Sequence, residues 1–225
     1  MKLLAIDTST EACSAAVMID GEILERYRLA PREHTRLILP MIDELLSESG
    51  VKVGGLDAVA FGRGPGAFTG LRIAAGVVQG IAFGADLPVV PVSSLATLAQ
   101  AVWLHQGHEY VLALIDARMQ EVYGAHYRYQ GTEMELVDEE RVGEVSALLS
   151  AESTDCYCAG SGSREYAEQL QAHTNYHLLA DRELDLPRAG VLASLAVSAY
   201  ARNERVSAAQ LEPSYLRNQV VQIKT

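Results

Sequence analysis

Two aspartates each end a short apolar segment, a position from which an acidic residue can hold Mg²⁺ in a phosphate-binding hairpin. Asp7 follows Leu4-Ala5-Ile6, and Asp116 follows the apolar run 112–115. In such a hairpin the next backbone N–H groups, beginning with that of Thr8, hold phosphate oxygens. A phosphate crowds the backbone and normally requires glycine, which neither turn contains. The residues predict either a degenerate nucleotide cleft or two capped hairpins that bind no ligand.

Two glycine-rich loops are further candidates for nucleotide binding. The first runs over residues 62–72, between an expected strand and an expected helix, where backbone N–H groups can cradle a phosphate. Its spacing matches neither the P-loop nor the dinucleotide fingerprint, so a structural turn is the competing interpretation. The second loop contains Gly160 and Gly162. It could contact an adenine and a ribose, or form a tight turn before a helix capped by Ser163.

The histidines and cysteines form no metal-ligand pattern. His173 and His177 are four residues apart without the glutamate of a His-Glu-x-x-His motif, and His34 stands alone. Cys156 and Cys158 alternate on one expected strand with no second pair. A zinc or iron site needs a fuller set of ligands, so we expect no metal. No nucleophile is ordered beside a base, so we expect no catalytic residue.

The composition is that of an acidic globular protein. The chain has 225 residues, of which 49% are hydrophobic and 21% charged, and its formal net charge is −11. A stand-alone nucleic-acid binder normally has a basic surface, which this balance disfavours. Three cysteines and the lack of a secretory apolar core favour a reducing, cytoplasmic location. The uncharged run 73–85 is short for a bilayer span and the run 87–104 contains two prolines, so we expect no membrane segment.

Hydrophobic periodicity and turn residues predict an α/β protein in which one element order occurs twice. In the first half we expect strands over 2–6, 12–19, 22–29, 56–61 and 88–92, and helices over 35–49, 71–84 and 93–105. In the second half we expect strands over 110–115, 121–129, 133–137 and 155–159, helices over 142–149, 164–173 and 190–202, and an irregular tail over 212–224. A repeated βββαβα unit is the signature of the actin-like (ASKHA, ribonuclease H-like) fold, in which two lobes face a cleft. We predict an N-terminal lobe over residues 1–105 and a C-terminal lobe over 106–225.

The expected helix 71–84 carries three glycines, at positions 76, 80 and 84, on one stripe. Glycine costs a helix about 1 kcal/mol relative to alanine, so the stripe indicates that another backbone comes close. That backbone belongs either to the protein's own sheet or to a partner. The helix 35–49 has a wide apolar face, and two such helices side by side suit a dimer interface. The residues predicted for this docking surface are Leu37, Met41, Leu45, Leu71, Arg72, Ala75, Gly76, Gln79, Gly80 and Phe83.

Four segments together resemble the TsaB family, formerly called YeaZ, over nearly the whole chain. They are LAIDTST at 4–10, GPGAFTGLR at 64–72, DARMQEVY at 116–123 and PSYLR at 213–217, with Ala67 where the family usually has serine. The resemblance implies a part in placing threonylcarbamoyl on N6 of adenosine 37 in tRNAs that read codons beginning with A. It also implies a subunit that docks on the transferase TsaD, self-associates through its first-half helices, is joined by the ATPase TsaE and reaches tRNA mainly through these partners.

The resemblance leaves the metal ligands of TsaD unmatched. TsaD holds a metal through a His-x-x-x-His pair, whereas this chain has His34 followed by Ile38 at the comparable positions. We therefore expect a non-catalytic scaffold subunit with no cofactor of its own. The expected place for any bound ATP or ADP is the boundary with TsaD. The first alternative is an ATP-dependent small-molecule kinase of the same fold that uses Asp7 and Asp116. The second is a peptidase, an older description of this superfamily.

Overall fold

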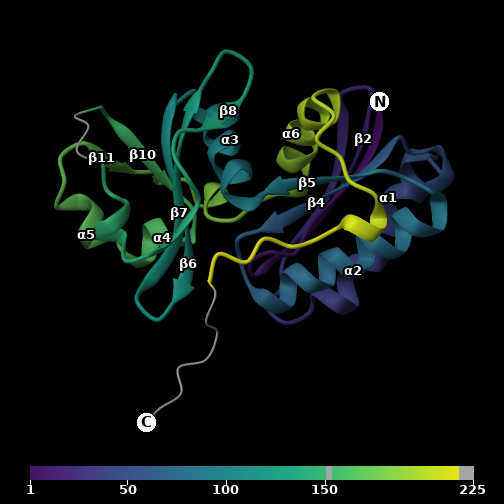
Figure 1. Cartoon of the computed structure of the whole chain (residues 1–225), viewed down its shortest axis with the longest axis horizontal. Coiled ribbons are helices and arrows are strands. Elements are labelled where there is room, and N and C mark those ends of the chain that lie inside the picture. The colour runs from purple at the N-terminus through teal and green to yellow at the C-terminus, as the bar shows by residue number, and fades with distance from the viewer. Residues whose placement is uncertain (151–153, 218–225) are drawn as a thin grey trace, which may run out of the picture.

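The chain folds into two β-sheets, each with helices on both faces. The computed structural model describes residues 1–150 and 154–217. Figure 1 shows the layers in order along the long axis: α4 (Ser161–Glu165) and α5 (Ala167–Gln171), the second sheet, α3 (Ser94–Gln106) and α6 (Ala189–Ala201), the first sheet, and finally α1 (His34–Ser49) and α2 (Phe68–Ala85).

The first sheet has the strand order β3-β2-β1-β4-β5. Its antiparallel strands are β1 (Lys2–Asp7), β2 (Ala12–Ile19) and β3 (Glu22–Leu29), and its parallel additions are β4 (Ala58–Gly64) and β5 (Val89–Ser93). β1 and β2 are buried along nearly their whole length because helices cover both faces. Asp20 and Gly21 have positive φ and close the β2–β3 hairpin, as an Asp-Gly pair predicts.

Helices α1 and α2 pack on one face of the first sheet, and α6 packs on the other. Alternate side chains of β1 divide the two cores, as the period of a strand requires. Leu4 and Ile6 lie in the core with α1 and α2, whereas Leu3 and Ala5 lie in the core with α6. The sheet therefore holds its helices on opposite sides, which leaves the outer surfaces of α1 and α2 free of other layers (Figure 1).

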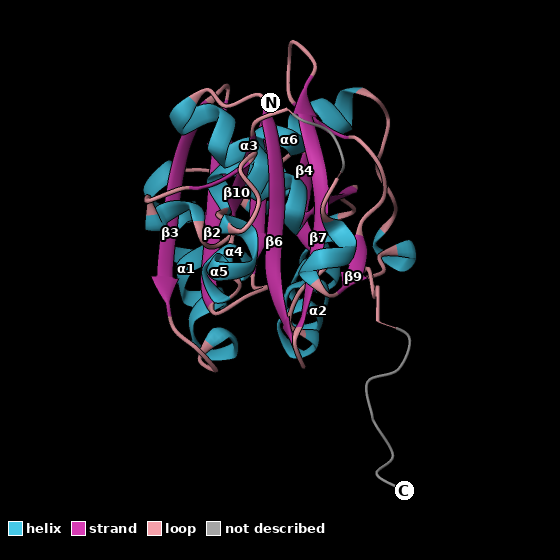
Figure 2. Ribbon diagram, turned by 90° about the vertical axis from the view of Figure 1, so that its left-hand side faces the viewer, coloured by secondary structure: helices cyan, strands magenta, loops and turns pink. Residues whose placement is uncertain are grey.

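The second sheet has the strand order β11-β10-β6-β7-β8, with β9 pairing to β7. Its strands are β6 (Tyr110–Arg118), β7 (Glu121–Tyr129), β8 (Met134–Leu136), β9 (Arg141–Gly143), β10 (Cys156–Ala159) and β11 (Tyr176–Leu178). β6 and β7 form a long antiparallel hairpin, seen face-on in Figure 2, and β10 and β11 run parallel to β6.

The two sheets share one topology. The order β3-β2-β1-β4-β5 in the first corresponds to β8-β7-β6-β10-β11 in the second, with the same parallel and antiparallel relations. Two such sheets, with helices between and outside them, are the actin-like, ribonuclease H-like arrangement predicted from the repeated element order. That fold class is confirmed.

Helices α3 and α6 each cover the sheet of the other half of the chain. α3 follows β5, yet its Leu95 and Leu98 pack in the core of the second sheet. α6 follows the second sheet, yet its Leu192 and Ala196 pack against the first. Both helices are mostly apolar, as expected for helices between two layers. The predicted division after residue 105 therefore separates the two sheets but not their helices, because the chain crosses between the lobes.

Within the described part of the second half, the structure departs from the predicted elements in three places, and residues 218–224 of the predicted irregular tail lie outside the described residues. Residues 142–149, predicted as a helix, instead form the end of β9 and the 3-10 turn η2 (Val145–Leu148), because pairing with β7 takes up the backbone. The predicted helix 164–173 starts at Ser161 and breaks at Tyr166 into α4 and α5. β11 is missing from the prediction, because a three-residue strand is defined by its pairing to β10 rather than by a sequence pattern.

Candidate functional site

An open cleft of about 1060 Å³ lies between the lobes, lined by the turns after β1 and β6 and by the N-terminal ends of α1 and α2. Of the residues predicted for a nucleotide cleft, only Asp116 lines this space, and Asp7, Thr8, Gly160 and Gly162 do not. The charged and aromatic side chains that line it instead include Arg32, Arg118, Arg217, Tyr123 and Tyr215. The cleft is present as predicted, but most of the predicted nucleotide-binding residues lie outside it.

The glycine-rich loop covers the turn after β1. A Cβ on Gly70 would lie 1.9 Å from the carbonyl oxygen of Thr8, and a Cβ on Gly66 would lie 2.2 Å from that of Ser9. The Thr8 hydroxyl donates a hydrogen bond to the Gly70 carbonyl at 2.7 Å. Glycine is required at both positions because backbone packs directly on backbone. The loop therefore packs on the Thr8 and Ser9 carbonyls at the start of the turn, while Ser9, Thr10 and Glu11 still line the cleft. The structural-turn interpretation of this loop is confirmed.

Asp7 is fully buried beneath this turn and does not face the cleft. Its Oδ1 accepts hydrogen bonds from the Ser9 backbone N–H at 2.9 Å and from the Ser9 hydroxyl at 2.8 Å. Its Oδ2 has no hydrogen-bond partner within the described ranges and lies against Gly62, where a Cβ would be 2.0 Å away. Burial raises the pKa of Asp7 to about 6, and the two bonds from Ser9 oppose that rise. Desolvation thus disfavours the ionised form that a metal ion would need.

The turn after β6 is open to the cleft. Asp116 accepts a hydrogen bond from the Arg118 N–H at 2.9 Å and pairs with the Arg118 guanidinium at 3.0 Å. Arg118, Met119 and Gln120 have φ values of 63°, 58° and 62°, a left-handed run that is costly for non-glycine residues. The two aspartates predicted to act together are separated in environment, because Asp7 is sealed in the first lobe while Asp116 faces the cleft.

Gly160 and Gly162 allow close packing against β6. A Cβ on Gly160 would lie 2.1 Å from the Leu114 carbonyl oxygen, and a Cβ on Gly162 would lie 2.9 Å from the Leu114 Cβ. Between them, Ser161 lines the cleft, and its hydroxyl oxygen accepts a hydrogen bond from the Asp116 N–H at 3.1 Å. The tight-turn interpretation of this loop is confirmed, although the helix begins at Ser161 and Ser163 is not its cap.

His34 contacts backbone in the first lobe. Its Nε2 lies 3.0 Å from the Thr10 carbonyl oxygen and 3.2 Å from the Ala12 carbonyl oxygen, and the ring is buried. Across residues 1–150 and 154–217, no group of three or more His, Cys, Asp or Glu side chains is placed to hold a metal ion. His34 therefore ties the start of α1 to the β1–β2 turn.

The outer face of α2 is mostly exposed and carries three glycines and Phe83 beside the polar residues Arg72 and Gln79. Only 28% of the helix is buried, and it is the one described helix long and apolar enough to cross a membrane by length and composition alone. Phe83 is 81% exposed. Cβ atoms on Gly76, Gly80 and Gly84 would meet no atom of the described chain within 4 Å. Packing on the protein's own sheet, the first of the two explanations for the glycine stripe, is therefore excluded.

Four residues predicted for the docking surface lie inside the protein. Met41 and Leu45 of α1, and Leu71 and Ala75 of α2, are buried in the first lobe. The prediction was wrong because the sheet takes up the apolar stripe of each helix, and successive helical residues turn by about 100°. Leu37 is half-buried, and the predicted residues that do face outward are Arg72, Gly76, Gln79, Gly80 and Phe83.

One cluster near the start of α2 is missing from the predicted site. The Arg72 guanidinium lies 3.9 Å from the centre of the Phe68 ring, and its Nε donates to the Tyr215 hydroxyl at 3.3 Å. The Phe68 and Tyr215 rings are 5.4 Å apart. Tyr215 belongs to the PSYLR segment that carried the family resemblance, but that segment has no regular secondary structure. Hydrophobic periodicity predicts only helices and strands, so it could not predict that Tyr215 lies beside α2.

The fold and the cleft define a two-lobed α/β protein of the actin-like class. A family model described as "TsaD: tRNA N6-adenosine threonylcarbamoyltransferase" matches residues 26–225 of the chain. Individual relatives that are similar to the chain over nearly its whole length identify the family within this class. The chain belongs to the TsaB family, also called YeaZ.

Two relatives and one solved structure carry this assignment. Proteins of Haemophilus influenzae and Escherichia coli, each named "tRNA threonylcarbamoyladenosine biosynthesis protein TsaB", are 42% and 41% identical to the chain. Each alignment covers 98% of the chain, with 95% of the first relative and 96% of the second. The structure "YeaZ from Pseudomonas aeruginosa" is 48% identical with a TM-score of 0.89, and the match covers 96% of this chain and 99% of that one. The predicted resemblance is confirmed.

Proposed function

We propose that the chain is a non-catalytic subunit in the formation of threonylcarbamoyladenosine at position 37 of tRNAs that read codons beginning with A. In this proposal it docks on the threonylcarbamoyltransferase TsaD in the cytoplasm, and the ATPase TsaE joins the complex. Family membership links the chain to threonylcarbamoyladenosine biosynthesis, because its relatives are named for that process.

The observation that carries the non-catalytic role is the covered turn after β1. Phosphoryl transfer depends on positioned donors and a metal ion around the phosphates. Here Gly66 and Gly70 lie on the backbone of that turn, and the carboxylate of Asp7 is buried beneath it. Exposing these groups would require the start of α2 to leave the first sheet. A lobe packed in this way is suited to hold a partner rather than to bind a phosphate.

The outer face of α2 supports docking of a partner. An exposed helix face that carries a large apolar side chain such as Phe83 is a candidate interaction site. Gly76 and Gly80 allow a second helix to approach without side chains between the two backbones, and Phe83 projects beside them. Arg72, already oriented by Phe68 and Tyr215, provides the type of aromatic and arginine anchor that is common in interfaces. In this proposal TsaD and a second copy of the chain use the same face, so the homodimer forms only when TsaD is absent.

Contact with tRNA is assigned mainly to the partners. Binding to a phosphate backbone draws on Lys and Arg side chains, whereas the chain has a net charge of −11. A nucleotide, if one binds, is assigned to the boundary with TsaD, where the second protein would supply the groups that the covered turn withholds.

An ATP-dependent kinase is the second candidate, favoured by the volume of the cleft and by the position of Asp116 in it. Isothermal titration of the isolated chain with ATP and Mg²⁺ separates the two candidates. The scaffold proposal expects no binding heat and no ADP production. Micromolar binding together with transfer of phosphate to a small molecule would replace it with the kinase.

The main test is depletion of the protein in its host cells, followed by mass spectrometry of tRNA nucleosides. We expect threonylcarbamoyladenosine to disappear and to return with the wild-type chain. An Asp7→Asn chain should also restore it, because Asp7 has no catalytic role in this proposal. A Gly76→Leu chain should restore it poorly, because docking is impaired. Normal threonylcarbamoyladenosine after depletion would overturn the proposal.

A further inference from the structure

Several arginine–glutamate pairs join the two lobes. At the interface between the lobes, Glu140 of the β8–β9 connection has a side chain that is only 7% exposed and pairs with Arg63 of β4 at 3.0 Å. The other carboxylate oxygen of Glu140 accepts hydrogen bonds from the hydroxyls of Tyr127, at 3.0 Å, and of Ser93. Ser93 and Arg63 belong to the first sheet, and Tyr127 and Glu140 belong to the second lobe. A buried charge with this set of partners resists separation of the lobes.

A second connection comes from residues 207–217, which we name the C-terminal strap. The strap starts on the first lobe, where the Ala208 carbonyl accepts a hydrogen bond from Gln79 of α2 at 3.0 Å. Further along, the Ser214 N–H donates to the Arg63 carbonyl at 2.7 Å. The strap then reaches the second lobe, where Arg217 pairs with Glu121 at the start of β7. Figure 1 shows this segment crossing from α2 toward β6.

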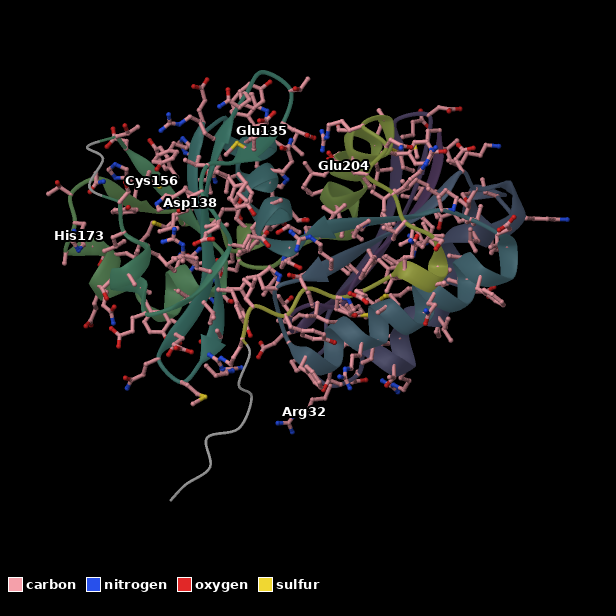
Figure 3. The ribbon with its side chains drawn as sticks, viewed as in Figure 1. Arg32, Glu135, Asp138, Cys156, His173 and Glu204 are labelled. Carbon is pink, nitrogen blue, oxygen red and sulfur yellow. The ribbon has the colours of Figure 1, made fainter. Side chains whose placement is uncertain are left out.

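A third connection lies on the side of the molecule opposite to the end of the strap. Arg202, after α6 on the first lobe, pairs with the nearly buried Glu133 of the second lobe and also binds Glu204, whose pKa it lowers. Figure 3 places Glu204 and Glu135 at the facing upper edges of the two lobes, whereas Arg32 lies at the lower edge, on the side where the strap ends.

We propose that these three connections hold the lobes at one fixed angle, so that the cleft does not close on a nucleotide. Two-lobed proteins that close on a ligand rotate about a hinge. A rotation that closes the cleft at the strap would stretch the Arg202–Glu133 pair on the opposite side, and a rotation in the other direction would stretch the Arg217–Glu121 pair. Arg63 links two of the connections, because its side chain pairs with Glu140 while its carbonyl receives the strap. This inference does not depend on the proposed function.

The test is a distance measurement between the lobes by double electron–electron resonance. Spin labels go on Ser47→Cys of α1 and Gln169→Cys of α5, which are exposed on opposite lobes, while the native cysteines are buried. The labelled chain is diluted with unlabelled chain so that a second copy adds no distance. We expect one narrow distance distribution for the wild type, unchanged by ATP and Mg²⁺.

The charged pairs of the three connections are then removed together in a chain carrying Glu140→Gln, Glu133→Gln and Arg217→Ala. Glutamine keeps the acceptor for Ser93 and Tyr127, so this chain is expected to fold, and circular dichroism checks that it does. If it does not, the double variant Glu140→Gln with Arg217→Ala replaces it. The distance distribution should widen. The control Arg26→Ala removes pairs to Glu44 and Glu48 within the first lobe and should leave the width unchanged.

Two outcomes would overturn the inference. In the first, the folded variant keeps the wild-type width, so the pairs do not set the angle. In the second, the wild-type distance shifts with ATP and Mg²⁺, so the lobes close despite the pairs. Neither result bears on docking through α2, which is measured separately.

Discussion

Equivalent turns in the two lobes have opposite environments. After β1, Asp7 is buried and the turn is covered by residues 64–70, whereas after β6 Asp116 faces the cleft beside Arg118. Because the sheets share a topology, the difference in burial must come from other elements. β4 pairs in parallel with β1, β10 pairs in parallel with β6, and each is followed by a helix that lies near the turn. In the first lobe this is the 18-residue helix α2, and in the second it is the five-residue helix α4.

The comparison shows how a duplicated fold can divide its roles. The first lobe keeps a long helix by packing its start on the turn, which buries Asp7 and covers the Thr8 and Ser9 carbonyls, and the outer face of this helix remains exposed. The second lobe keeps an open turn, and the helices described outside its sheet, over residues 106–150 and 154–217, are short. Strand order is preserved in both lobes because the sheet cores specify it, while the helices and turns have diverged.

The largest expected effect comes from filling the contact that covers the first turn. Gly70→Ala should lower the free energy of unfolding by more than about 3 kcal/mol, because its Cβ would overlap the Thr8 carbonyl. Gly76→Ala, in open space on the same helix, should instead raise it by about 1 kcal/mol. Urea unfolding measures both. If the two variants were equally stable, the turn would not be covered in solution.

The next effect is a pH dependence that arises from Asp7. Burial raises its pKa from 3.8 to about 6, so the folded chain binds this proton more tightly than the unfolded chain. The stability contributed by Asp7 therefore falls as the pH rises from about 4 to about 6, by about 3 kcal/mol at most, and stays low above that range. Asp7→Asn cannot ionise, so it should be more stable than the wild type at pH 8 but not at pH 4.

Ser9→Ala provides the matched comparison for Asp7. It removes the hydroxyl that donates to Asp7 at 2.8 Å and helps to lower the pKa of that carboxyl. The fall in stability should therefore move to higher pH. Urea unfolding across this pH range measures all three chains. If the free energies of unfolding of the wild type and Asp7→Asn changed with pH in the same way, the raised pKa of Asp7 would be contradicted.

The third effect concerns the exposed face of the first lobe. Gly76→Leu should leave the isolated chain folded, because no described atom lies within 4 Å of the new side chain's Cβ. It should weaken both self-association and binding to TsaD by about 1–3 kcal/mol, since the added side chain keeps a partner helix at a distance. Calorimetry and analytical ultracentrifugation measure the two equilibria. Gln169→Leu, on exposed α5 of the second lobe, serves as the control and should change neither. Unaltered TsaD binding by Gly76→Leu would refute this choice of face.

The smallest effect comes from the strained turn of the second lobe. Gln120 has a φ of 62°, which glycine adopts without penalty, so Gln120→Gly should raise the free energy of unfolding by about 1 kcal/mol. Thr10 lies in the corresponding turn of the first lobe and has no positive φ, so Thr10→Gly relieves no such strain and should lower the free energy of unfolding. Urea unfolding compares the two variants, and a loss of stability with Gln120→Gly would show that its side chain supports the turn.

The sequence predicted the strands of the first lobe well because their information is local. Asp20-Gly21 specifies the β2–β3 hairpin, and the apolar runs of β1 and β2 are continuous because both faces are buried. The recurrence of one element order then indicated the actin-like class. The second lobe was predicted less well, because the residues of β9 and β11 become strands only by pairing with distant segments.

The candidate site was predicted only in part, for the same reason. The glycine stripe pointed to α2, whose glycines do face outward, but the pattern could not separate its inner residues, such as Leu71 and Ala75, from its outer ones. It also placed Asp7 in a cleft, because sequence spacing carries no information about the segment that covers a turn.

The sequence by itself determined the family, the order of helices and strands along the first lobe, and the lack of the His-x-x-x-His pair that the resemblance implies for TsaD. Only the tertiary structure decided that Gly66 and Gly70 lie on the first turn, that α3 and α6 exchange sheets, and that the strap brings Tyr215 to α2. Local patterns record the backbone preferences and burial periodicity of neighbouring residues. Contacts between residues far apart in the chain depend on how whole layers pack, and in this protein those contacts decide which surfaces remain available to a partner.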